Sequence, residues 1–325
     1  MALKTRLTER LGLTHPIVSA PMAHVAGGAL AAAVSRAGGL GMIGGGYGED
    51  IWLEHQFELA GKARVGCGFI TWSLARRPFL LDLALDRFPV AVMLSYGDPQ
   101  MFSERILSDE VTLICQVQTL EMARGAIAAG ADILVAQGAE AGGHGMARAT
   151  MTLVPEIADL LARSAPDTLL LAAGGIADGR GLAAALLLGA DGVLMGSRFF
   201  ASREALVHDN LRAAALAADG DATLRTGALD RIRGLPWPEG FTARVLRNDF
   251  IDKWQAEAAA LSQPPDGAAE AFFAGTEEGD AGVAGVFVGE GTGLIRDIVP
   301  AGELVARISQ QAEHLLVATA PGFVL

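Results

Sequence analysis

The chain has 325 residues, of which 51% are hydrophobic and 19% are charged, a size that fits one large domain with an insertion or two domains. The balance of 25 basic against 37 acidic residues gives a net charge of −12, which argues against nucleic acids and anionic membranes as partners, because these bind a basic surface. Two cysteines, Cys67 and Cys115, are too few for a disulfide framework, and the start of the chain is too polar for a signal peptide, so we expect reduced thiols and a cytoplasmic location.

Short apolar runs with the character of buried strands recur through the first two thirds of the chain. They do not alternate with polar residues, which is typical of parallel strands covered on both faces. These runs are 16–20, 40–44, 64–70, 90–96, 111–117, 133–138, 169–175 and 192–197.

Segments rich in alanine and leucine lie between these runs and predict helices. The clearest are 26–37, 50–60, 78–87, 119–129, 152–163 and 179–188. Eight strands alternating with helices predict an α/β fold of the (β/α)₈ TIM barrel type. A doubly wound sheet, which needs fewer strands, is the alternative.

A weak internal repeat supports this unit. The segments "AAGADILVAQG" (128–138) and "LLGADGVLMGS" (187–197) share Gly-Ala-Asp, an apolar strand and a glycine. Gly130 and Gly189 fit the left-handed position that ends a helix. The segment "RAGGLGMIGGG" (36–46) is a looser third copy.

The repeating pattern stops near residue 201. The stretch "GLPWPEGF" (234–241) is turn-rich, "RVLRNDFIDKWQAEAAAL" (244–261) predicts an amphipathic helix, and "QPPDG" (263–267) predicts a loop. The segment 299–316 predicts a closing helix that returns to the barrel. We therefore expect a barrel made of 1–200 and 290–325, with a mainly helical insertion or lid at 201–289.

Several loops that follow the predicted strands are dense in glycine, and in a parallel barrel these loops form the site. The loops after the seventh and eighth strands usually cradle a phosphate with backbone N–H groups. Candidates to hold a phosphate are Gly174, Gly175, Gly196 and Ser197, unless these residues serve only as turns. No dinucleotide fingerprint, P-loop, metal-ligand spacing or nucleophile elbow is found.

A single histidine, His144, stands in the loop "GAEAGGHG" after the sixth strand. An imidazole with an ordinary pKa of about 6.5 suits proton transfer near neutrality, and its small neighbours leave room for a substrate. The alternative is a loop histidine that only hydrogen-bonds a carbonyl or touches a cofactor.

Together these motifs resemble the nitronate monooxygenase family, formerly called 2-nitropropane dioxygenases, which are FMN-dependent TIM-barrel enzymes. The resemblance rests on "PIVSAPMA", "VAQGAEAGGHG", "LLLAAGGIADGRGLAAALLLGADGVLMGSRFFAS" and "GLPWPEGFTARVLRNDF". These pieces occur in order and span nearly the whole chain.

The resemblance implies FMN as cofactor, His144 as the catalytic residue, and a set of residues around the flavin. The implied cofactor-binding residues are Ala20, Pro21, Met22, Ala23, Gln116, Gln137, Gly142, Gly143, Gly174, Gly175, Met195, Gly196 and Ser197. Some members carry lysine in place of Gln116 and aspartate in place of Gln137. The missing cation near the flavin requires a substitute such as Arg76 to favour the anionic reduced flavin.

The implied reaction is oxidation of an alkyl nitronate, or a nitroalkane, by O₂ to a carbonyl compound and nitrite. His144 would remove a proton from a nitroalkane or stabilise the charge of a nitronate. Met22, Trp72, Met146 and Phe199 could wall the substrate pocket or belong to ordinary packing, and His24 could add a polar group. No metal, nucleic-acid or membrane partner is expected, and the oligomeric state stays open, a homodimer included.

Three alternatives share some of these features. The first is an FMN-dependent NAD(P)H reductase of enoyl thioesters or quinones on the same scaffold. The second is a barrel of the IMP-dehydrogenase type, which needs a loop cysteine that neither Cys67 nor Cys115 supplies. The third is a flavin- or phosphate-binding protein without catalysis.

Overall fold

The computed structural model describes residues 3–257 and 266–319 of the chain. Within these residues eight parallel strands form one sheet in the order β1-β9-β8-β6-β5-β4-β3-β2. They are β1 (Ile17–Ser19), β2 (Met42–Gly44), β3 (Gly66–Ile70), β4 (Ala91–Ser95), β5 (Thr112–Val117), β6 (Ile133–Gln137), β8 (Leu169–Ala173) and β9 (Gly192–Met195). Val18 of β1 pairs in parallel with Leu40, two residues before β2 begins, and this closes the sheet into a barrel. The expected TIM barrel is therefore confirmed, and the doubly wound sheet is excluded.

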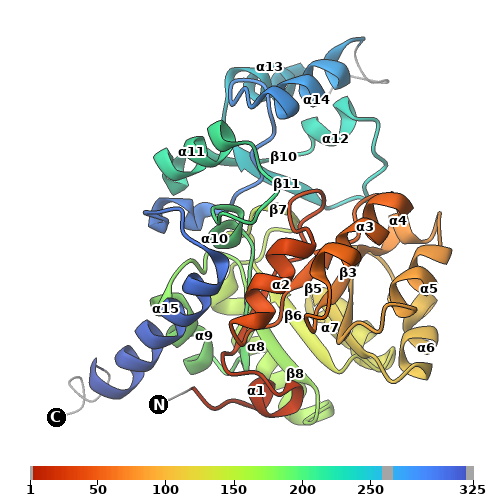
Figure 1. Cartoon of the computed structure of the whole chain (residues 1–325), viewed down its shortest axis with the longest axis vertical. Helices are drawn as coiled ribbons and strands as arrows, with labels where there is room; N and C mark the ends of the chain where they lie inside the picture. Colours follow the sequence, from red (N-terminus) through yellow and green to blue (C-terminus); the bar gives the residue numbers. More distant parts are fainter. Residues whose placement is uncertain (1–2, 258–265, 320–325) are drawn as a thin grey trace.

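Helices cover the outside of the barrel (Figure 1). They are α2 (Gly28–Arg36), α3 (Asp50–Ala60), α4 (Thr71–Leu74), α5 (Phe79–Leu85), α6 (Gln100–Ser108), α7 (Leu120–Ala128), α8 (Thr150–Ser164), α9 (Gly179–Leu187) and α15 (Ala301–His314). Helix α15 packs against both α9 and α2, so the last helix closes the outer ring between the helices after β8 and β1. A π-helical turn (Leu315–Thr319) follows it.

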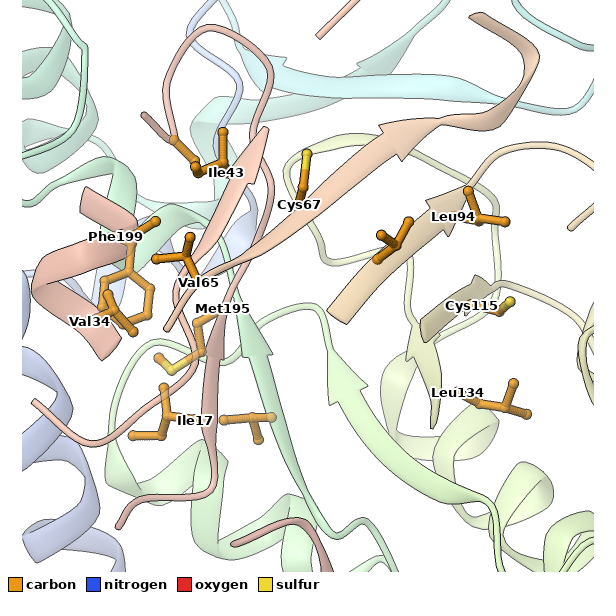
Figure 2. Close-up of a cluster of buried hydrophobic side chains, with 14 of the residues drawn as sticks. Ile17, Val34, Ile43, Val65, Cys67, Leu94, Cys115, Leu134, Met195 and Phe199 are labelled. Carbon is orange, nitrogen blue, oxygen red and sulfur yellow. The ribbon is translucent and has the colours of Figure 1, made fainter. Parts of the chain in front are cut away.

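Alternate residues of the strands pack on opposite sides of the barrel wall. Ile43, Cys67 and Cys115 point outward into the layer shared with the helices (Figure 2), while Met42 and Met93 fill the barrel interior. Because both faces are buried, the strands read as continuous apolar runs in the sequence. Burial raises the pKa of both thiols, that of Cys115 to about 12, so both are inert packing groups.

Helix α1 (Arg6–Leu11) covers the N-terminal end of the barrel, with Leu7 and Leu11 among the interior side chains. Its Arg10 pairs with Asp132 at 3.1 Å, and Arg6 lies 3.7 Å from Asp191. These two aspartates come from the repeated Gly-Ala-Asp motif.

The repeat has a structural reason. Gly130 and Gly189 both have positive φ, +83° and +96°, so the predicted left-handed helix ends are confirmed. Asp132 Oδ2 then accepts from Leu113 N, and Asp191 Oδ2 accepts from Leu170 N, each at 2.9 Å. The motif therefore ends a helix and satisfies the amide of the second residue of the neighbouring strand.

The segment 201–289 lies over the C-terminal end of the barrel, opposite α1 (Figure 1). After α10 (Ser197–Phe200) it contains α11 (Asp209–Ala217), η1 (Gly220–Ala222), β10 (Thr223–Thr226), α12 (Ala228–Ile232), β11 (Thr242–Leu246), α13 (Asp249–Glu257) and α14 (Ala268–Glu278). The 3₁₀ turn η3 (Glu290–Leu294) leads back towards α15. The division into barrel and lid remains our proposal.

The strands in this segment differ from the helical prediction. Residues 244–246 belong to β11 rather than to a helix, and α13 begins at Asp249. Strand β11 pairs antiparallel with both β10 and β7 (Gly143–Gly145), a strand formed by the loop after β6. Because β11 takes its partners from distant parts of the chain, local periodicity favoured a helix there. The ends of the predicted helix and loop, 258–261 and 263–265, lie outside the described residues.

No helix in the described part of the chain is both long and apolar enough to cross a membrane.

Candidate functional site

A cavity of about 530 Å³ opens at the C-terminal end of the barrel, between the strand ends and the lid. This volume is within the range of small-molecule and cofactor sites. The residues expected at the site that line it are Ala20, Pro21, Met22, Ala23, His24, Gln116, Gln137, Gly142, Gly143, His144, Gly174, Gly175, Gly196 and Ser197. The structure thus brings most of the residues expected at the site into one cavity.

Two of the expected residues have side chains in the core instead. Phe199 is fully buried beside Val34 of α2 (Figure 2), because the single turn of α10 directs it beneath the barrel rim. Of the two alternatives given above for Phe199, its position in the core agrees with ordinary packing. Met195 also points into the outer core, although its carbonyl accepts from Ala20 N at 2.9 Å and so holds the β1 loop.

Trp72 and Met146 lie near the cavity without lining it. The ring of Trp72 packs edge-on to Trp237, with centroids 5.5 Å apart, so it stands behind the cavity wall. The methyl group of Met146 faces Gly240. Arg76 lies on the outside, 5.3 Å over the Trp72 ring, so it does not supply the cation expected near the flavin.

Glycines after β8 and β9 form a cradle at one end of the cavity. Gly174 and Gly175 have positive φ, +106° and +73°, which L side chains rarely adopt. A Cβ on Gly196 would lie 3.6 Å from Ala20 Cβ, on the floor of the cavity. Ser197 Oγ accepts from Gly289 N at 2.8 Å, which leaves the hydroxyl proton free to donate. This donor set suits a phosphate, and therefore fits FMN.

The loop 20–23 approaches the strand ends closely. A Cβ on Gly68 would lie 2.3 Å from Pro21 Cγ, and a Cβ on Gly44 would lie 2.4 Å from Met22 O. Glycine is therefore required at both strand ends, because any side chain would displace this loop. The backbone of the loop forms a flat wall on which a flavin ring could lie.

His144 is a buried polar group in the cavity wall, and it pairs with Asp230 behind that wall. Nε2 of His144 lies 3.0 Å from both carboxylate oxygens, and the two side chains are only 7% and 6% exposed. Asp230 belongs to α12 in the lid, whereas His144 belongs to β7. Arg233 Nη2 donates to Asp230 Oδ1 at 2.8 Å, so the carboxylate contacts both His144 and Arg233.

Backbone pairing fixes the position of the imidazole. His144 stands opposite Ala243 of β11 in the lid sheet. Its carbonyl accepts from Tyr96 Oη and from Gln137 Nε2, both at 3.0 Å. The histidine is therefore held by the barrel and the lid together.

Gln137 is committed to protein contacts. Its Oε1 accepts from Gln116 Nε2 at 2.9 Å and from Gln118 Nε2 at 2.7 Å. The row of three glutamines thus braces the His144 backbone. All of these contacts are hydrogen bonds between neutral side chains.

Burial sets the protonation state of His144. Desolvation lowers its pKa below the usual 6.5, and the nearby charges of Arg233 and Arg225 act in the same direction, while Asp230 opposes them. The imidazole is therefore neutral at neutral pH. With Nε2–H donating to the carboxylate, the lone pair of Nδ1 is left to accept a proton.

Sequence reasoning missed Asp230, Arg233 and Phe287, and it named Trp237 only as part of a turn. Asp230 is separated from His144 by 86 positions, so no local spacing connects them. The motif "GLPWPEGF", quoted above for its turns, was the available signal that this lid segment enters the site.

Comparisons with known proteins agree with this geometry. The family model described as nitronate monooxygenase matches residues 4–58 and 76–311. A nitronate monooxygenase, npaC, from Metarhizium robertsii is 37% identical over 331 residues, covering 92% of this chain and 91% of that protein.

Solved structures are similar as well. FabK from Thermotoga maritima superposes with a TM-score of 0.85 at 31% identity, covering 99% of this chain and all of the other. A nitroalkane oxidase from Streptomyces ansochromogenes gives a TM-score of 0.79 at 26% identity, covering 95% of this chain and 98% of the other.

Proposed function

The chain belongs to the nitronate monooxygenase family and is a flavin-type oxidoreductase, and from this premise we propose that it uses FMN to oxidise alkyl nitronates or nitroalkanes with O₂. The products are a carbonyl compound and nitrite. The observation that carries the proposal is His144, which lines the cavity and is held by the buried Asp230, together with the glycine loops that line the same cavity.

FMN fits the residues present. Gly174, Gly175, Gly196 and Ser197 would hold its phosphate, and the backbone of 20–23 would support its ring. When bound, FMN supplies a ring that accepts electrons from the substrate and is reoxidised by O₂. The lid above the cavity limits the access of water to this ring.

His144 acts on the proton next to the nitro group. In its neutral form it removes this proton from a nitroalkane, because Asp230 orients the ring and stabilises the imidazolium that forms. For a substrate that arrives as a nitronate, protonated His144 stabilises the negative charge instead. Both roles require only the imidazole of His144.

A second candidate function is reduction of an enoyl thioester or a quinone by NAD(P)H on the same flavin. The close structural match to FabK favours it. The two functions differ in the electron donor, because the reductase takes a hydride from NAD(P)H whereas the monooxygenase takes electrons from its substrate.

The test is to mix the purified flavoprotein with propyl-2-nitronate and to measure O₂ consumption and nitrite. We expect turnover in the wild type and a loss of about 10²- to 10⁴-fold with 2-nitropropane in His144→Ala, the usual contribution of a general base. Flavin content must stay unchanged in this variant. The exposed His55 provides a matched control, and His55→Ala should behave as the wild type.

The same preparation separates the alternatives. Rapid anaerobic bleaching of the flavin by NADH, without nitrite formation from the nitronate, would overturn the monooxygenase function in favour of the reductase function. A variant His144→Ala that retains both flavin and full turnover would remove the proton-transfer role.

A further inference from the structure

Arg233 is an arginine buried at the wall of the cavity with part of its hydrogen-bonding capacity unused. Its side chain is 8% exposed and lines the cavity. Nε donates to Leu229 O at 3.1 Å and Nη2 donates to Asp230 Oδ1 at 2.8 Å. Within the described residues, Nη1 has no hydrogen-bond partner.

Two aromatic rings fix the guanidinium. Its central carbon lies 5.4 Å from the ring centroid of Phe272 and 5.5 Å from that of Phe287, and both rings line the cavity. Cation–π contact and planar packing stabilise the charge and prevent the side chain from moving out to solvent. The guanidinium is therefore held in place at the cavity wall.

The position of Arg233 relative to His144 follows from their shared partner. Nη2 of Arg233 and Nε2 of His144 both lie within hydrogen-bond distance of Asp230 Oδ1. The ring of Phe287 lies beside both residues, with its centroid 6.4 Å from that of His144. A ligand group that reaches Nη1 is therefore next to the imidazole.

The charges of Arg233, Asp230 and His144 together favour the binding of an anion. Arg233 and Asp230 balance each other, so an anion adds one negative charge that a proton on His144 would neutralise. An N–H of guanidinium is a strong donor to a planar group with two oxygens, such as a carboxylate or a nitronate. A neutral nitro group gains much less from the same contact.

We propose that Arg233 is the specificity-determining residue of the site: its free Nη1 binds an oxygen of a planar oxyanion, so the enzyme selects substrates in the anionic nitronate form and also binds small carboxylates. This inference rests on the proposed function for the nitronate, but the carboxylate site stands on the geometry alone. Neutral nitroalkanes are consequently the poorer substrates.

The experiment measures binding without turnover. Propionate is titrated into the flavin-loaded protein, and its dissociation constant is read from the change in the flavin absorption spectrum. We expect Arg233→Met to weaken propionate by about 10- to 100-fold, the equivalent of one charge-assisted hydrogen bond, and Arg233→Lys to weaken it less. Propionamide, the neutral analogue, should bind the wild type and Arg233→Met alike.

Two further variants keep the result interpretable. Arg247 pairs with Asp252 on the surface, so Arg247→Met is a control for the loss of one positive charge. The double variant Arg233→Met/Asp230→Asn removes both buried charges together. It replaces Arg233→Met in the propionate titration if that single variant fails to fold. Retained flavin content and the far-ultraviolet circular dichroism spectrum report folding in each case.

The outcomes are distinct. If Arg233→Met, or the double variant in its place, binds propionate as tightly as the wild type, or if the wild type binds no carboxylate, the inference is overturned. If the wild type binds propionate through Arg233 but does not oxidise propyl-2-nitronate, the anion site stands and the proposed function fails. Where nitronates are oxidised, kcat/KM for the nitronate should fall more in Arg233→Met than kcat/KM for the neutral nitroalkane.

Discussion

The imidazole of His144 stacks face to face on the indole of Trp237, with ring centroids 3.3 Å apart and planes inclined by only 4°. Trp237 belongs to the link between α12 and β11, so the lid supplies the cover for one face of the histidine. Asp230 from the same lid binds its edge. The barrel positions the backbone of His144, and the lid determines how much water reaches its ring.

Removal of the indole should raise the pKa of His144. Burial is the main cause of the lowered pKa, so Trp237→Ala admits water and moves the pKa upward, towards about 6.5. The neutral form is then present only above a higher pH than in the wild type, because the base is lost as the pH falls through this pKa. Titration of the imidazole C–H resonances by nuclear magnetic resonance measures the shift, with His144→Ala assigning the signal.

Trp72 offers the control for this measurement. It contacts Trp237 but is not among the rings that contact His144, so Trp72→Phe should leave the titration of His144 unchanged. If the pKa of His144 is unchanged or lower in Trp237→Ala, burial by the indole is not the cause of the lowered pKa in the wild type.

Replacement of Asp230 should move the same pKa in the opposite direction. The carboxylate raises the pKa of His144, while the charge of Arg233 lowers it. Asp230→Asn removes the first influence and leaves the second, so the imidazole becomes harder to protonate. We expect turnover of a nitroalkane to fall by about 10- to 100-fold, because the ring loses its orienting charge.

The same variant should be less stable. Asp230→Asn leaves the guanidinium of Arg233 buried without a counter-charge, which costs about 3 kcal/mol in the free energy of unfolding. Urea denaturation measures this loss. Asp252→Asn breaks a solvent-exposed ion pair and should change stability by less than about 1 kcal/mol. Equal losses in the two variants would contradict a buried charge network.

The floor of the cradle can be filled without distorting the fold. Gly196 has a φ of −103°, which any residue adopts, and a Cβ there meets only Ala20 Cβ and Met22 Sδ at ordinary contact distances. Gly196→Val should therefore fold but lower the affinity for FMN by about tenfold or more, since its methyl groups occupy the cavity. Gly196→Ala should have a smaller effect.

Flavin affinity is measured by ultrafiltration and fluorescence of the released cofactor. Gly174 is unsuitable for this test, because its φ of +106° makes any substitution strained regardless of the ligand. If Gly196→Val binds FMN as tightly as the wild type, the phosphate lies elsewhere.

The barrel could be predicted because its determinants are local. Each strand is a continuous apolar run, and Gly130 and Gly189 mark helix ends through their own backbone conformation. His144 could be named because a titratable ring stands alone among glycines at a strand end. Such features depend on a few consecutive residues, which a sequence displays directly.

The lid's contribution could not be predicted for the opposite reason. Asp230 and Arg233 reach the site only because the fold brings α12 next to β7. In the same way, β11 is a strand because β10 and β7 pair with it on either side. Phe199 follows β9 in the sequence, as a pocket residue would, but it belongs to the short helix α10 and its side chain is buried in the core. Contacts between distant segments decide these positions.

The closed end of the barrel provides a test of stability that leaves the site untouched. Leu7 of α1 is fully buried among the interior side chains, and its Cδ2 would lie 2.6 Å from a Cβ on Gly192. Leu7→Ala leaves a void at the end opposite the cavity, so we expect a loss of about 3 kcal/mol in the free energy of unfolding with unchanged FMN affinity. Leu187, which is 74% exposed on α9, gives the matched substitution Leu187→Ala with little expected change. A weaker flavin affinity in Leu7→Ala would show that packing at the N-terminal end is coupled to the loops that form the site.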